Sequence, residues 1–133
     1  MIKALFINVE SGEPAKTVAI QDENQFKEFS NLIGCEYVDC VKRYVNGKAY
    51  RFIVDDVGAL KKNPTPSAIN RFSQIMLYGN VVVCGEENAV GELTSLTDED
   101  IDNLLANVHR FFPNGRPRGY CMIILDDILP QNV

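Results

Sequence analysis

The chain has 133 residues, of which 46% are hydrophobic and 23% charged, as in an ordinary globular domain. These values predict a single domain over residues 1–133 and exclude a disordered polar chain, a collagen-like repeat and a disulfide-stapled miniprotein. Thirteen basic and eighteen acidic side chains give a net charge of −5, which argues against duplex DNA or an anionic membrane as the partner.

The N-terminal apolar run, Ile2–Val9, is too short for a signal peptide, and no small-residue cleavage site follows it. No other apolar stretch approaches the roughly 18 residues that a membrane span needs. We therefore expect a cytoplasmic protein. Its four cysteines should be reduced there, because cytosolic redox buffers keep thiols free.

The first third of the chain predicts a hairpin followed by a helix. Residues 2–9 and 16–20 have strand character, and a turn at Ser11–Pro14 separates them. Asp22 and Gln25 are spaced like a capping box, which predicts the start of a helix, and Gly34 is expected to end it. The apolar face of this helix comprises Phe26, Phe29, Leu32 and Ile33.

A second hairpin is predicted around Asn46-Gly47, because both residues of this dipeptide tolerate the positive φ of a type I′ turn. The turn joins strands at 35–45 and 48–54 and fixes their register. The predicted pairs are Val45 with Lys48, Arg43 with Tyr50, Val41 with Phe52, and Asp39 with Val54. The predicted core face carries Tyr37, Val41, Tyr50, Phe52 and Val54. The opposite face carries Tyr44 and places Lys42 directly across from Arg51.

A turn at 55–58 and a polar loop at 61–66 come next in the chain. Pro66 suits the first position of a helix, with Thr65 as its cap, and this helix is expected to end near Tyr78. Its apolar stripe is Ile69, Phe72, Ile75 and Met76. A short buried strand at 81–84 follows.

The last third begins with an acidic connection at 86–95. Thr97 then caps a third helix whose acidic first turn suits the positive end of the helix dipole. The predicted apolar stripe of that helix is Ile101, Leu104, Leu105, Val108 and Phe112. A basic loop at 113–119 leads to a final strand at 120–125. The whole predicts an α+β fold: a mostly antiparallel sheet of about five or six strands, with three helices packed on it.

Thiol and histidine chemistry is not favoured. Cys35 and Cys40 are the only close cysteine pair, and their odd spacing places them on opposite faces of one strand, so we expect buried apolar filler and no metal site. His109 is the only histidine, and a cation near a helix end explains it without catalysis. A nucleophile pair of His109 with Cys84 or Cys121 is the less favoured alternative.

The acidic groups come in runs, which raises the question of a magnesium or acid–base site. They are Asp55-Asp56, Glu86-Glu87, Asp98–Asp100 and Asp126-Asp127. Because most of them fall in turns or in a first helical turn, we interpret them as solvated. Neither a Walker pattern nor a dinucleotide fingerprint occurs. We therefore expect no cofactor, no metal and no enzymatic activity.

The basic side chains are the better candidates for a site. Lys42 and Arg51 face each other by register, and like charges directly opposite destabilise a bare hairpin. An anion held by this pair would relieve the repulsion, with Tyr44, Arg71 and Tyr78 as further candidate binding residues. The alternative is a structural ion network, in which an acid from a neighbouring strand contacts both cations.

Several blocks, in this order, resemble one bacterial family, DUF3846, a domain of unknown function. They are Ile33–Val41, the Asp55-Asp56 turn, Pro66–Tyr78 with Asn70-Arg71, Val81–Gly85 and Gly91–Ile101. The resemblance covers about residues 1–105, leaving 106–133 as a C-terminal part. Where the family carries a Gly-Gly pair, this chain has Gly34-Cys35. The family's Leu-Pro-Pro-Asn-Arg-like block is loosened here to Pro64-Thr65-Pro66 followed by Asn70-Arg71.

The resemblance implies a small accessory protein of a phage, plasmid or conjugative element. The first functional hypothesis is that it binds a protein of the host or of the element. The second is that it sequesters an anionic, nucleotide-type small molecule through Lys42 and Arg51. DNA mimicry ranks last, because it needs denser negative charge than −5. A homodimer through an exposed edge strand is a further expectation, since cyclic dimers are the commonest assemblies.

Overall fold

A computed structural model of the protein describes residues 1–9, 15–61, 64–112 and 119–126. The elements in chain order are β1 (Ile2–Ile7), β2 (Lys16–Ile20), α1 (Gln25–Ile33), β3 (Val38–Val45), β4 (Lys48–Asp55), the 3₁₀ turn η1 (Gly58–Leu60), β5 (Pro66–Asn70), β6 (Ile75–Tyr78), β7 (Val81–Gly85), α2 (Asp98–Ala106), β8 (Val108–Phe111) and β9 (Tyr120–Leu125). The predicted turn at 11–14, most of the basic loop at 113–119, and Asp127 lie outside the described residues.

The strands form two sheets. The first has five antiparallel strands in the order β2-β1-β7-β4-β3. The second has four strands in the order β6-β5-β9-β8, in which β5 and β9 run parallel and the other pairs are antiparallel. The prediction of α+β structure with mostly antiparallel strands is confirmed. The prediction of one sheet with three helices is wrong: the described residues form two sheets and two α-helices.

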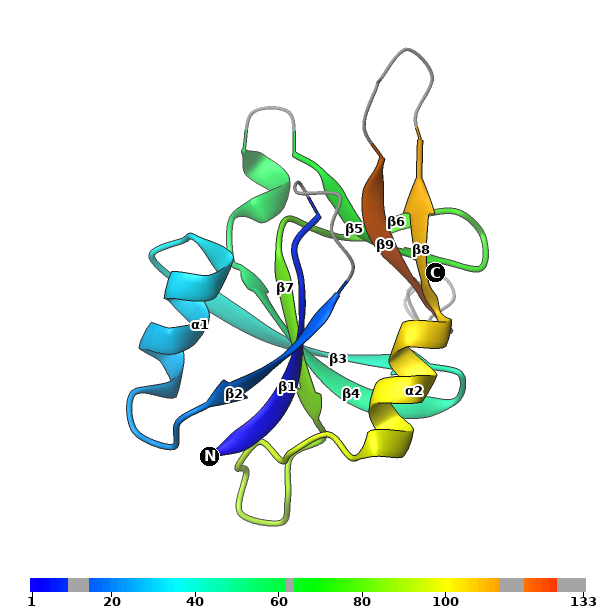
Figure 1. Cartoon of the computed structure of the whole chain (residues 1–133). Coiled ribbons are helices and arrows are strands. Elements are labelled where there is room, and N and C mark those ends of the chain that lie inside the picture. The colour runs from blue at the N-terminus through cyan, green and yellow to red at the C-terminus, as the bar shows by residue number, and fades with distance from the viewer. Residues whose placement is uncertain (10–14, 62–63, 113–118, 127–133) are drawn as a thin grey trace.

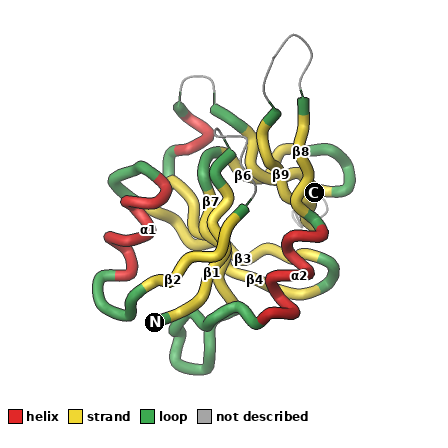
Figure 2. Tube along the Cα trace, in the orientation of Figure 1, coloured by secondary structure: helices red, strands yellow, loops and turns green. Residues whose placement is uncertain are grey.

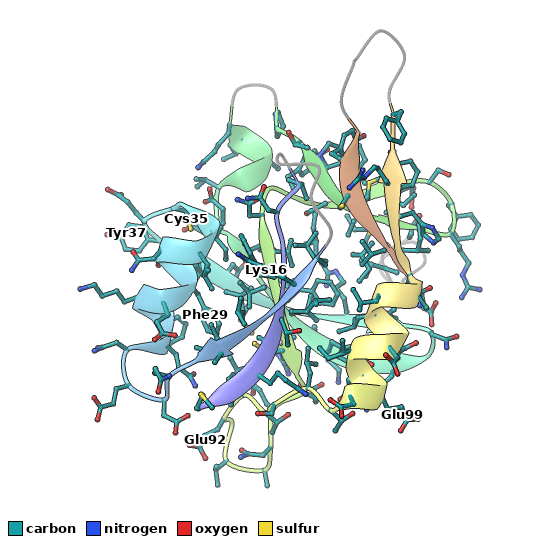
Figure 3. All side chains as sticks on the ribbon, viewed as in Figure 1. Lys16, Phe29, Cys35, Tyr37, Glu92 and Glu99 are labelled. Carbon is teal, nitrogen blue, oxygen red and sulfur yellow. The ribbon has the colours of Figure 1, made fainter. Side chains whose placement is uncertain are left out.

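The first sheet is the middle layer of the fold (Figures 1 and 2). Helix α1 packs on one face of it, where Phe29 from the helix meets Ile53 and Val82. Phe29 points from the helix toward the sheet in Figure 3. The second sheet and α2 supply Ile123 and Leu104 to a larger core that includes the opposite face of the first sheet. Burial of both faces explains why β7 is apolar throughout.

The Asn46-Gly47 hairpin has the predicted register at every position. Val45 pairs with Lys48, and Lys42 lies opposite Arg51. Both turn residues have positive φ, 51° for Asn46 and 79° for Gly47, as a type I′ turn requires. One assignment on this hairpin was wrong: Tyr37 precedes β3 and is 70% exposed, so it is not part of the core.

The predicted helix from Pro66 to Tyr78 is wrong. This segment is a hairpin of β5 and β6, and β5 also pairs with β9. The apolar spacing fits a helix, but Phe72 from that stripe is 57% exposed. Asn70 provides the physical reason, because its side chain binds backbone N–H groups of the following turn and so competes with helical hydrogen bonds.

The third predicted helix is shorter than its apolar spacing suggests. Thr97 caps α2 as predicted, and its hydroxyl and Asp100 form a reciprocal capping box. The helix ends at Ala106, because the β-branched and aromatic segment that follows pairs with β9 as strand β8. His109 therefore lies on a strand, and Leu105 of the predicted stripe is 41% exposed.

Helix α1 begins and packs differently from its prediction. Its N-cap is Asn24, which makes no side-chain capping bond, so the expected start at Asp22 is wrong. Gly34 ends the helix in a left-handed conformation, as predicted. On the predicted apolar face, Phe29 and Ile33 are buried, but Phe26 is 68% exposed.

Candidate functional site

The predicted basic pair already has a carboxylate partner within the protein. Lys42 Nζ lies 3.3 Å from Glu86 Oε2, and Arg51 Nε donates to Glu86 Oε1 at 2.5 Å. Arg51 Nη1 also lies 3.6 Å from a Glu87 oxygen, and Lys42 Nζ is 5.7 Å from the Tyr44 ring centroid. The structure thus shows the ion network that was the alternative to an anion site.

The electrostatics of this cluster favour the charged forms of all three central groups. The hydrogen bond from Arg51 is the largest cause that lowers the pKa of Glu86, to about 2. The hydrogen bond with Glu86 raises the pKa of both Lys42 and Arg51. An incoming anion would therefore have to displace a carboxylate that stays ionised at neutral pH.

The other two candidate binding residues lie elsewhere. Tyr78 is the last residue of β6, where it pairs with Pro66 in the second sheet. Arg71 follows β5, and its Nη2 is 3.9 Å from Asp126 Oδ1. The structure therefore brings Lys42, Arg51 and Tyr44 together on the first sheet and places Arg71 and Tyr78 on the second.

Two carboxylates predicted to be solvated are buried. Asp100 is 5% exposed and accepts hydrogen bonds from Lys48 Nζ, from the Tyr50 hydroxyl at 3.1 Å and from the Thr97 N–H at 2.9 Å. Asp55 is 9% exposed and lies 2.6 Å from Lys61 Nζ. Asp55 is the last residue of β4 and Asp100 lies in the first turn of α2, so both belong to packed elements and not to the solvated turns that the sequence suggested.

Asp100 lies beside a hollow of about 260 Å³ between α2 and the second hairpin. Asn103 also lines it, and its side chain donates to the Tyr50 hydroxyl at 2.9 Å and to the Val45 carbonyl at 3.2 Å. Burial raises the pKa of Asp100, but the hydrogen bonds from Lys48 and Thr97 outweigh this effect and the net shift is downward. Because these polar groups satisfy one another, we interpret them as the bonds that hold α2 to the hairpin.

The thiols and the histidine are not arranged for nucleophilic catalysis. Burial raises the pKa of Cys84 to about 12, so its thiol is protonated at neutral pH. His109 is exposed and pairs with Met122, whereas Cys121 is the neighbour of Met122 and its side chain points to the opposite face. Among the described residues, no group of three or more His, Cys, Asp or Glu side chains is placed to hold a metal ion.

A feature that the sequence prediction missed is the turn between β5 and β6. We call residues 70–74 the Asn70 loop. The Asn70 amide oxygen accepts from the N–H of Phe72 at 2.9 Å and of Gln74 at 3.1 Å. Its amide nitrogen donates to Gln74 Oε1 at 2.8 Å. The Asn70 backbone N–H donates to the Gln74 carbonyl, and its own carbonyl accepts from Ser73.

The Asn70 loop is held from within the protein but displays two large side chains. Asn70 itself is 1% exposed, whereas Phe72 is 57% exposed and the Arg71 side chain 61%. Ser73 has φ 61°, in the left-handed region that non-glycine residues rarely adopt. Asparagine commonly forms turns by bonding to backbone groups that follow it, so Asn70 itself was the sequence signal for this loop.

The fold and these surfaces define a two-sheet α+β protein with no metal or thiol–histidine site among its described residues. The family model "Domain of unknown function (DUF3846)" matches residues 2–109, so the chain belongs to this family. This confirms the predicted resemblance, whose expected range was about residues 1–105. Neither a curated protein nor a solved structure matches the chain. No helix in the described part of the chain is long and apolar enough to cross a membrane.

Proposed function

We propose that the protein is a non-enzymatic accessory protein of a phage or mobile element, and that it acts by binding a protein partner through the Asn70 loop. The supporting observation is the contrast within this loop between a buried, fully bonded asparagine and an outward-facing Arg71 and Phe72. Side chains of these kinds dominate the binding energy of many interfaces, and arginine and aromatic residues are enriched there.

The order of the loop supports the same function. Ordering a flexible loop at an interface costs free energy that reduces affinity. In the Asn70 loop, the N–H groups of Phe72, Ser73 and Gln74 all bond to Asn70 before any partner is present. Arg71 and Phe72 are therefore presented from a fixed backbone.

The chemistry of the loop defines the kind of partner surface that fits it. Phe72 needs an apolar pocket, and the guanidinium of Arg71 pairs best with a carboxylate in a planar, two-bond geometry. Asp126 is the acidic neighbour of Arg71, at 3.9 Å, which is too long for a direct hydrogen bond. We therefore expect a partner with an apolar pocket that has an Asp or Glu at its rim.

The test is affinity capture from cells that naturally carry the gene, followed by quantification of each captured protein. The wild-type chain should capture one protein in a fixed ratio. The double variant Arg71→Ala, Phe72→Ala should reduce this capture at least tenfold, because truncating two such residues weakens binding by about 2 kcal/mol or more.

The matched control is Val90→Ala, which truncates an exposed apolar side chain in another asparagine-centred loop. It should leave the capture unchanged. If the double variant captures every protein as well as the wild-type chain does, the Asn70 loop is not the binding surface. If both variants lose capture equally, the effect is not specific to the loop.

The second hypothesis, sequestration of an anionic nucleotide-type molecule, has less support because Glu86 contacts both Lys42 and Arg51. It makes a distinct prediction. In calorimetry with linear and cyclic nucleotides, Glu86→Gln should bind more tightly than the wild-type chain, and Lys42→Ala should lose binding. An absence of heat for both wild-type chain and Glu86→Gln would remove this hypothesis.

A further inference from the structure

The two edges of the five-stranded sheet differ in how their backbone groups are satisfied. At the β3 edge, three outward groups have partners: the Cys40 N–H donates to Asp39 Oδ1, the Lys42 carbonyl accepts from Arg43 Nη1, and the Tyr44 carbonyl accepts from the Asp126 N–H. Such bonds and charged side chains block the addition of another strand.

The β2 edge is at the other end of the sheet (Figure 1). On β1, the Lys3 N–H and carbonyl bond to Ser95 and Leu96, away from β2. Backbone directions alternate along an antiparallel ladder, so Ile2, Ala4 and Phe6 bond to β2, and their partners in register are Ile20, Val18 and Lys16. The N–H and carbonyl groups of Thr17 and Ala19 consequently point outward.

These four outward groups have no partner among the residues that the structure describes. Thr17 and Ala19 are exposed, and β2 contains neither proline nor a bulge, two devices that protect an edge; its one charged residue, Lys16, is at the end of the strand. Helix α1 contacts β3, β4 and β7 as well as β2, so it lies on one face of the sheet.

We propose that β2 of a second copy of this chain pairs antiparallel with this edge and forms a symmetric dimer. The outward positions fix the register: Thr17 pairs with Ala19 of the second copy, Ala19 with its Thr17, and the two Val18 residues face each other on the twofold axis. This pairing satisfies all four groups of each copy with four hydrogen bonds, and the two five-stranded sheets become one continuous sheet.

The charges at the two ends of β2 favour a second copy of this chain as the partner at this edge. Lys16 lies at one end of the strand, and the exposed Asp22 and Glu23 follow the other end, where Asp22 also pairs with the N-terminal ammonium at 2.6 Å. An antiparallel pair brings the basic end of each copy to the acidic end of the other, twice, and keeps the two lysines apart. In this register Lys16 lies opposite Ile20 of the second copy and diagonal to its Asp22, and opposite charges at such positions favour association. This dimer goes beyond the proposed function, because the Asn70 loop lies on the other sheet.

The test is the sedimentation of the full chain from about 1 μM to about 1 mM. The wild-type chain should dimerise with increasing concentration. Ala19→Pro removes an outward N–H without touching the β1 ladder, and each dimer loses two hydrogen bonds, so its dissociation constant should rise about 30-fold. The matched control Ala19→Val keeps the N–H and should still dimerise.

A second measurement tests the register. With Cys35 and Cys40 replaced by serine, Val18→Cys should form a disulfide between copies under oxidation, because facing residues in a non-hydrogen-bonded pair have Cα atoms about 4.5 Å apart. Thr17→Cys on the same background should crosslink far less. A chain that is monomeric throughout the concentration range overturns the proposal. If the chain dimerises but Ala19→Pro does not weaken the dimer and Val18→Cys forms no disulfide between copies, the dimer does not form through β2.

Discussion

Two loops of this protein share one hydrogen-bonding pattern and differ in almost everything else. In the Asn70 loop and in the Asn88 loop (residues 88–92), the asparagine amide oxygen accepts from the N–H groups two and four residues later. In both, the asparagine N–H donates to the carbonyl four residues later, and its carbonyl accepts from the N–H three residues later. Glu92 of the second loop is labelled in Figure 3.

The two loops differ in the burial of the asparagine and in the residue at the left-handed position. Asn70 is buried, whereas Asn88 is exposed. The left-handed position is Ser73 in one loop and Gly91, with φ 83°, in the other, and glycine adopts this region without cost. A strained backbone persists only where its surroundings over-determine it, and such positions cluster at functional sites. The comparison shows that one hydrogen-bonding pattern forms both a buried, strained loop and an exposed loop with a glycine at the left-handed position.

The largest expected effect on stability is the difference between substituting Asn70 and substituting Asn88. Asn70→Ala should lower the free energy of unfolding by about 3 kcal/mol, because it removes buried hydrogen bonds and leaves a small cavity. Asn88→Ala should cost about 1 kcal/mol or less, since water can replace its bonds. Urea denaturation of both variants measures the difference. Equal losses would show that burial does not distinguish the loops.

The strained position gives the next prediction. Ser73→Gly should raise the free energy of unfolding by up to about 1 kcal/mol, because relief of the left-handed strain exceeds the added chain entropy of glycine. Gly91→Ala should lower it by about 1 kcal/mol, although the added methyl group would meet only Glu87 Oε2, at an ordinary contact distance of 4.0 Å. Opposite signs in thermal denaturation support this account, and destabilisation by both substitutions contradicts it.

The pH dependence of the Glu86 network is the third prediction. The folded pKa of Glu86, about 2, lies below its ordinary value of 4.5, so this carboxylate stabilises the folded state above pH 4.5 and loses that effect as pH falls toward 2. The stability difference between wild-type chain and Glu86→Gln should therefore be constant near neutral pH and shrink through this window. A difference that does not change with pH would show that the charge of Glu86 is irrelevant.

The smallest effect is expected for the displayed side chains. The double variant Arg71→Ala, Phe72→Ala should change the free energy of unfolding by no more than about 0.5 kcal/mol, as exposed side chains usually do. Denaturation of this variant beside Val90→Ala checks it. A large loss would mean that Phe72 packs within the protein and is not available to a partner.

Local chemistry made part of this fold predictable. Asn46-Gly47 determines the register of β3 and β4, and Thr97 determines the start of α2, because both act through neighbouring backbone groups. The hairpin of β5 and β6 was not predictable from apolar spacing, since its strand β5 depends on pairing with β9, more than fifty residues later in the chain. The end of α2 depends on the same distant strand.

The candidate site shows the same limit. The approach of Lys42 to Arg51 follows from the turn and is predictable, but Glu86 follows β7, and the pairing of β7 with β4 is not determined by the local sequence. Arg71 was identified as a candidate, while Phe72 beside it was assigned to a core. The helical interpretation of that segment hid the Asn70 loop, although the asparagine and its turn are local.

The central claim is that the Asn70 loop is ordered before a partner binds. Amide hydrogen exchange of the full chain without a partner tests this claim most directly. The N–H groups of Phe72 and Gln74 should exchange far more slowly than an unstructured loop, although their side chains are exposed. Asn70→Ala should remove this protection and leave that of β4 intact. Exchange at the unprotected rate in the wild-type chain would contradict a preformed binding loop.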